Sequence, residues 1–260
     1  MADACNHSLA LTQLAGDTGS RVHRLDPRAK LLGLLTVTFV VVSAPLGRWP
    51  VYAAGAAVLL AVAAAARIRP GDLWRRVRVV LPLVLLAAAL LPLLRRGGTS
   101  YDLGLLTVHQ AGLEIFGAVA AKATIGTSSA ALLGMTTAFP AVLRGLEALR
   151  VPRLLILIAA FMYRYLFVIV EELGRMRAAL AARGYRPRHA LQAGAMGRVA
   201  TAMFLRTYGR GERVYLAMLA RGYQGTMPRL DPLVLQRADV LFVAVIAGCL
   251  LPVRILAGTP

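Results

Sequence analysis

The chain has 260 residues, of which 58% are hydrophobic, and its mean hydropathy is +0.65. Such a positive mean excludes an ordinary water-soluble domain. The 30 Lys and Arg residues outnumber the 12 Asp and Glu residues and give a net charge of +18. Aromatic residues make up 7% of the chain and form no basic stacking platform, which argues against nucleic-acid binding.

Five apolar runs follow one another along the chain, at 31–44, 51–66, 79–94, 113–134 and 240–257. Each approaches the roughly 20 residues that a helix needs to cross about 30 Å of hydrocarbon. The first run follows Asp26 and Pro27, which suit the N-cap and first turn of a helix. A short surface helix is expected in the basic connection 67–78. The sequence predicts an all-α polytopic membrane protein with about five transmembrane helices.

The strongly apolar run 151–170 conflicts with the distribution of basic residues. The following stretch, 171–237, carries twelve arginines, and cytoplasmic segments carry the excess of Lys and Arg in membrane proteins. If 151–170 crossed the bilayer, one of its two basic flanks would lie outside. We therefore favour 151–183 as one long, partly immersed helix on the cytoplasmic side, which also spares Arg164 a position in mid-bilayer. Six spans are the alternative.

This topology predicts three regions. Residues 1–135 hold an N-terminal arm and four transmembrane helices, 136–238 form a cytoplasmic helical region, and 239–260 form the last transmembrane helix. The arm lacks a basic segment followed by an apolar core, so we expect it to be cytoplasmic rather than a cleaved signal peptide. Helices are expected at about 139–149, 152–183 and 196–221 within the cytoplasmic region.

Two of these helices end in the same four residues, Ala-Arg-Gly-Tyr, at 182–185 and 220–223. Glycine after the last turn is typical of a left-handed helix end, and an arginine there meets the negative end of the helix dipole. One copy would be an ordinary helix end. Two copies predict two slim tips whose guanidinium groups suit carboxylates or helix C-terminal carbonyls on a partner that also has two similar copies.

Several motifs together resemble the transmembrane (T) component of energy-coupling factor (ECF) transporters, most closely its cobalt-type permease subunit, CbiQ. They are HRLDPRAKLL at 23–32, TTAFPAVLRGLEALRVP at 136–152, YRYLFVIVEEL at 163–173, and the paired AARGY and LARGY. The resemblance implies that 136–238 is a coupling-helix region whose two Ala-Arg-Gly ends dock into two ATPase subunits. The residues implied are Ala182, Arg183, Gly184, Ala220, Arg221 and Gly222.

The resemblance also implies a division of labour. The chain would be a non-catalytic subunit in the bacterial inner membrane, with its N-terminus and coupling helices in the cytoplasm. Two CbiO-like ATPases would hydrolyse ATP, and a CbiM-like membrane component would bind the substrate, a cobalt ion or another micronutrient for cobalamin biosynthesis. A small CbiN-like accessory subunit would complete the complex. No cofactor is implied for this chain.

The residues themselves supply little for catalysis or metal binding. The four histidines, His7, His23, His109 and His189, have no metal-ligand spacing, and no phosphate-binding loop is present. We therefore predict no catalytic and no metal site. Glu114 and Lys122 lie eight residues apart on one helix face and could bind an ion, although interior packing or snorkelling is more usual. The alternative function is a stand-alone secondary transporter, for which no internal inverted repeat is visible.

Overall fold

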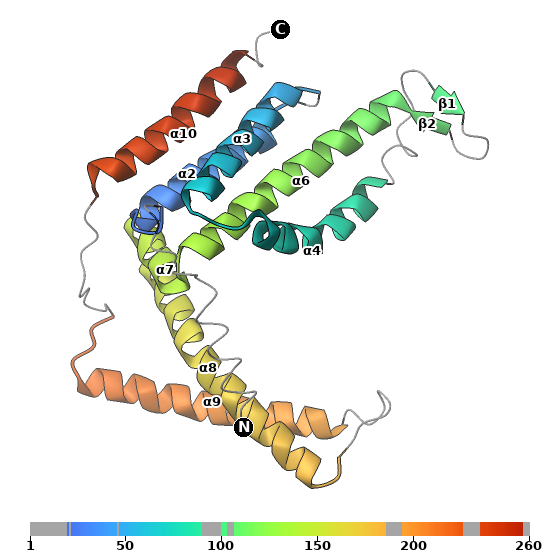
Figure 1. Cartoon of the computed structure of the whole chain (residues 1–260). Coiled ribbons are helices and arrows are strands. Elements are labelled where there is room, and N and C mark those ends of the chain that lie inside the picture. Colours follow the sequence, from blue (N-terminus) through green and yellow to red (C-terminus); the bar gives the residue numbers. More distant parts are fainter. Residues whose placement is uncertain are drawn as a thin grey trace. The chain divides into compact units, whose positions relative to one another are not determined.

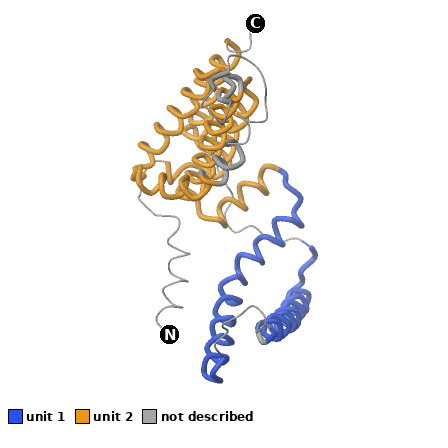
Figure 2. Tube along the Cα trace, turned by 90° about the vertical axis from the view of Figure 1, so that its right-hand side faces the viewer, with its two compact units in different colours: residues 1–13, 150–232 blue, residues 14–149, 233–260 orange. Residues whose placement is uncertain are grey.

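The computed structural model describes residues 20, 22–45, 47–89, 100–102, 107–185, 194–225 and 235–256. Two compact units divide the chain, as Figure 2 shows: unit 1 comprises 1–13 and 150–232, and unit 2 comprises 14–149 and 233–260. The elements of unit 2 are α2 (Pro27–Ser43), α3 (Trp49–Ala65), α4 (Pro70–Ala89), β1 (Ser100–Asp102), β2 (Thr107–His109), α6 (Gln110–Thr136), α7 (Phe139–Ala148) and α10 (Arg237–Leu256). Unit 1 contains α8 (Arg153–Ala182) and α9 (Gly194–Ala220) (Figure 1).

Helix α2 lies at the centre of unit 2 and packs against α3, α6, α7 and α10. Its start follows from the sequence, because the Asp26 side chain accepts a hydrogen bond from the Arg28 N–H at 2.8 Å and Pro27 occupies the first turn. Val37 and Val41 are fully buried in the core. Gly55 lets α3 approach closely, since a Cβ there would lie 2.6 Å from the Val41 side chain.

The prediction of an all-helical membrane protein is confirmed. Within the described residues, three helical stretches are long and apolar enough to cross a bilayer: Glu114–Thr136, Arg153–Ala182 and Arg237–Leu256. The 17-residue α3 is a shorter apolar helix. Large apolar side chains are exposed on unit 2, including Phe39 at 75%, and a lipid environment would cover them.

Two local features differ from the sequence expectation. The basic connection and the third apolar run form one continuous helix, α4, which begins at Pro70 and passes through Pro82 without ending. Residues 90–94 of that run lie outside the described residues, as does the N-terminal arm, 1–19. A short antiparallel hairpin, β1–β2, pairs Tyr101 with Val108 just before α6.

Helices α8 and α9 cross within unit 1 (Figure 1). The Glu172 carboxylate joins them, because it accepts hydrogen bonds from Arg175 on its own helix and from Arg206 on α9. None of the residues of α8 is buried, whereas Met203 of α9 is buried at the crossing. The expected long helix at 152–183 is thus a single 30-residue helix, and its position relative to a membrane stays a prediction.

Candidate functional site

Helix α8 ends in a left-handed turn at Gly184, whose φ is +75°. Arg183 is the C-cap residue. The Tyr185 N–H donates to the Leu180 carbonyl at 3.1 Å, and the Gly184 N–H donates to the Ala181 carbonyl at 3.0 Å. This pair of hydrogen bonds is the Schellman motif, which satisfies the last carbonyl groups of a helix and fixes the direction of the chain that leaves it.

Helix α9 ends in the same geometry. Gly222 has a φ of +81° and follows Arg221, the first residue beyond the helix. The Tyr223 N–H donates to the Met218 carbonyl at 3.0 Å, and the Gly222 N–H donates to the Leu219 carbonyl at 2.9 Å. Two separate helices of unit 1 therefore end in one repeated local structure, which the repeated sequence had predicted.

The two helix ends also expose the same positions. The exposed residues are Ala182, Arg183 and Gly184 at one end and Ala220, Arg221 and Gly222 at the other. In the part of the chain that the structure describes, neither arginine forms an ion pair. Each tip thus presents a charged guanidinium beside an alanine, whose small side chain does not crowd the arginine. The C-terminal ends of α8 and α9 lie on different sides of the helix crossing (Figure 1).

The glycines are required by backbone conformation rather than by close packing. A Cβ added at either Gly184 or Gly222 would meet no atom within 4 Å. A left-handed backbone, however, brings the Cβ of an L-residue too close to its own chain and costs about 1–2 kcal/mol. The conformation of each tip therefore depends on the absence of a side chain. Pro187 and Pro228, which we expected to help end these helices, lie outside the described residues.

A buried polar network in unit 2 was not anticipated from the sequence. The Lys30 Nζ donates to the carbonyls of His23 and Thr136, both at 3.0 Å. The Asp239 carboxylate accepts from the backbone N–H groups of Asp26 at 2.7 Å and Gln236 at 2.8 Å. Lys30 and Asp239 are each only 2% exposed. The network joins the first turns of α2 and α10 to the end of α6.

Lys122 has a packing role rather than an ion-binding one. Its Nζ donates to the carbonyls of Val42 at 2.9 Å and Ala44 at 2.7 Å. Arg254 donates to the Ser43 carbonyl at 3.1 Å, so two cationic side chains from α6 and α10 cap the end of α2. Cations at a helix C-terminus satisfy its open carbonyls and meet the negative end of its dipole. The sequence left open whether Lys122 and Glu114 bind an ion or take part in interior packing, and the contacts of Lys122 agree with interior packing.

Comparison with known proteins identifies a family whose matched residues include both helix ends. A family model described as cobalt transport protein, CbiQ, matches residues 18–231. The chain belongs to the CbiQ cobalt transport protein family. It is 33% identical over 122 residues to the cobalt transport protein CbiQ of Rhodobacter capsulatus, covering 45% of this chain and 50% of that one.

Two further relatives cover most of this chain. An energy-coupling factor transporter transmembrane protein, EcfT, from Thermosediminibacter oceani is 25% identical over 85% of this chain and 88% of its own length. A protein of Methanocorpusculum labreanum, whose name includes the words fused cobalt transport protein CbiMQ, is 26% identical over 89% of this chain and 40% of its own length. The chain spans less than half the length of this and several other curated relatives.

Proposed function

We propose that this chain is the transmembrane coupling subunit of an ECF-type importer, and that it transmits ATP hydrolysis by two ATPase subunits to a substrate-binding membrane component. The observation that carries the proposal is the pair of matching helix ends at Arg183 and Arg221. Membership of the CbiQ family and similarity to EcfT proteins support it. In this proposal the chain itself catalyses no reaction and only transmits movement between its partners.

Each tip docks into a groove of one ATPase. The Schellman geometry holds the arginine at the very end of a helix, and the guanidinium offers five donors in a planar fork. Carboxylates and helix C-terminal carbonyls are suitable acceptors. The neighbouring Ala182 and Ala220 keep the tips narrow enough to enter a groove. Two equivalent tips fit two ATPases that share one fold.

The two coupling helices transmit movement because they are joined to each other. When the ATPases close on ATP and reopen after hydrolysis, the two tips move relative to one another. The ion pair of Glu172 with Arg206 joins α8 to α9 at their crossing, and Arg175 holds the Glu172 carboxylate from within α8. Movement of either tip is therefore transmitted to both helices, and the substrate-binding partner reorients in response.

The cargo is a cobalt ion or a related divalent metal that the partner binds. The family description and the CbiMQ name of one relative support this assignment. In the proposed complex a CbiM-like component captures the ion, CbiO-like subunits hydrolyse ATP, and a small CbiN-like subunit completes the assembly. The twelve arginines of 171–237 support a cytoplasmic position for the coupling helices and the N-terminus in a bacterial inner membrane.

Affinity purification from native membranes tests this function. The wild-type chain is compared with Arg183→Ala, Arg221→Ala and the double variant, and co-purifying ATPase and ATP hydrolysis are scored together. Arg177→Ala is the matched control, since Arg177 is an exposed arginine of α8 away from its tip. We expect the single variants to weaken ATPase recovery or coupled activity and the double variant to abolish them. Full recovery in the double variant would refute the docking role, and absence of any ATPase with the wild type would refute the coupling function.

A further inference from the structure

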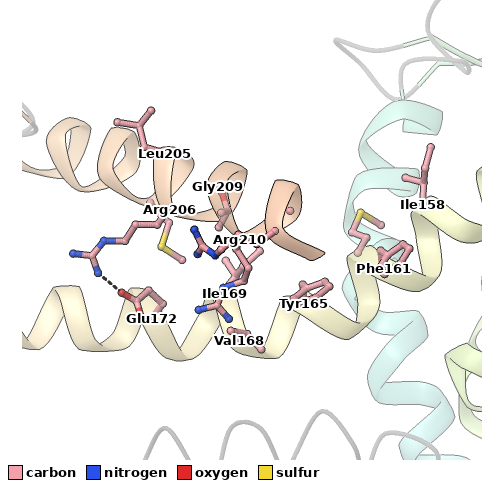
Figure 3. Close-up of a pocket in the computed structure, with 15 residues that line it drawn as sticks. Ile158, Phe161, Tyr165, Val168, Ile169, Glu172, Leu205, Arg206, Gly209 and Arg210 are labelled. Atoms are coloured by element: carbon pink, nitrogen blue, oxygen red, sulfur yellow. Dashed lines mark hydrogen bonds and ion pairs between the residues drawn. The ribbon is translucent and has the colours of Figure 1, made fainter. Parts of the chain in front are cut away.

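A cavity of about 720 Å³ lies between α8 and α9, inside unit 1. Its two walls differ in chemistry. The α8 wall is apolar and aromatic along most of its length, with Ile158, Phe161 and Tyr165, and it ends at Glu172. The α9 wall carries Arg206 and Arg210, which are labelled in Figure 3, and also Arg213. One side of the cavity therefore suits hydrocarbon, and the other suits an anion.

The positive charge of the cavity is only partly compensated. Glu172 pairs with Arg206, and Figure 3 shows this contact at one end of the cavity. Neither Arg210 nor Arg213 has an acidic partner among the residues that the structure describes. The spacing of the three arginines puts them on one face of α9, because residues three and four apart are neighbours on a helix. Two adjacent guanidinium groups thus remain available to one anionic group.

Two glycines make the α9 wall unusually bare. Gly209 and Gly211 lie in mid-helix and line the cavity. Glycine disfavours a helix relative to alanine, and one use that offsets this cost is the close approach of a ligand to the helix backbone. A Cβ at Gly211 would meet no atom within 4 Å, and at Gly209 it would meet only the Arg213 side chain. The packing of α8 on α9 therefore does not account for them, whereas a ligand lying against the helix would.

We propose that this cavity binds an anionic phospholipid, with the phosphate held by Arg210 and Arg213 and the acyl chains against the apolar wall of α8. Guanidinium groups bind phosphate bidentately, and basic pockets between helices of membrane proteins bind anionic headgroups. The apolar wall favours an amphiphile over a soluble phosphate compound. The uncompensated positive charge favours a lipid over the apolar helix of a protein partner. Such a lipid would brace the crossing of the two helices where Met203 alone is buried among the described residues of unit 1.

Native mass spectrometry of the purified full-length chain tests this site without any ATPase. The detergent-solubilised protein is incubated with equal amounts of phosphatidylglycerol and phosphatidylcholine, and bound lipid is counted for each species. We expect the wild type to retain one phosphatidylglycerol in preference to phosphatidylcholine. The variant R210Q/R213Q should retain at least about tenfold less, because hydrogen bonds to charged groups contribute this much or more to binding.

Two further variants separate the site from general charge effects. R177Q/R198Q removes two exposed arginines that do not line the cavity, and it should keep the lipid. Gly211→Leu places a bulky apolar side chain on the α9 wall of the cavity without changing charge, and it should lose the lipid while the helix content stays unchanged. Equal loss in R177Q/R198Q and R210Q/R213Q, equal retention of the two lipids by the wild type, or displacement by millimolar inorganic phosphate would overturn the assignment. Retention of the lipid by Gly211→Leu would also overturn the assignment. If that variant kept the lipid but lost a co-purifying membrane protein, the cavity would be a protein-docking site instead.

Discussion

The left-handed turn at Gly184 offers a sharp test because one added methyl group changes conformation alone. Gly184 has a φ of +75°, and a Cβ there would touch nothing within 4 Å. Gly184→Ala should therefore disfavour the observed helix end by about 1–2 kcal/mol without any clash. That free energy lowers the population of the docking geometry and should weaken binding to the ATPases about 5–30-fold. The assay is titration of the purified chain with its ATPase subunits, read as a dissociation constant.

Two companion variants show whether conformation is the cause. Gly184→Asn should bind more tightly than Gly184→Ala, because asparagine tolerates the left-handed region better than alanine does. Gly174→Ala is the matched control, since Gly174 is exposed in the middle of α8 and a Cβ there would also meet nothing within 4 Å. It should leave the dissociation constant unchanged. Equally tight ATPase binding by Gly184→Ala and Gly174→Ala would show that the left-handed turn does not control docking.

Three further outcomes follow from side chains outside the tips. Asp239→Ala removes the acceptor of one buried and one partly buried backbone N–H group and should cost about 2–5 kcal/mol of stability, seen as a lower thermal midpoint in detergent. An unchanged midpoint would contradict the network. Lys122→Met should uncap α2 and cost about 1–3 kcal/mol of stability, seen as a lower thermal midpoint, while Lys122→Arg should retain most of that stability. Equal effects of the two substitutions would argue against capping. Glu172→Arg should loosen the α8–α9 crossing, and adding Arg206→Glu should restore it, as measured by the distance between spin labels on the two helices. A double variant with the same distance as the single variant would exclude a role for the ion pair.

The parts of the fold that the sequence predicted have local causes. Asp26 and Pro27 start α2 through a cap that involves only neighbouring residues. The two Arg-Gly pairs end α8 and α9 because glycine tolerates the left-handed turn. Both helix ends of the candidate site could be predicted from the sequence, because a helix end is determined by a few consecutive residues.

The remaining features depend on contacts between distant segments. Asp239 reads in the sequence as an ordinary acidic residue in a first helical turn, yet its carboxylate binds the backbone of Asp26, 213 residues away. Lys122 binds backbone carbonyls of α2, and carbonyls have no signature in the sequence. The arginines of 67–78 suggested a connection with a short surface helix. Arginine is a good helix former, however, and from Pro70 α4 continues through Arg75, Arg76 and Arg78 into the apolar run.

Site-specific photo-crosslinking in native membranes tests whether each helix end contacts an ATPase subunit. A photoreactive residue is placed at position 182 or 220, beside the two tip arginines, and at position 39 as a control on the exposed surface of unit 2. We expect a crosslink to an ATPase subunit from each tip position and none from position 39. An ATPase crosslink from only one tip, or from neither, would contradict the claim that each helix end grips one ATPase.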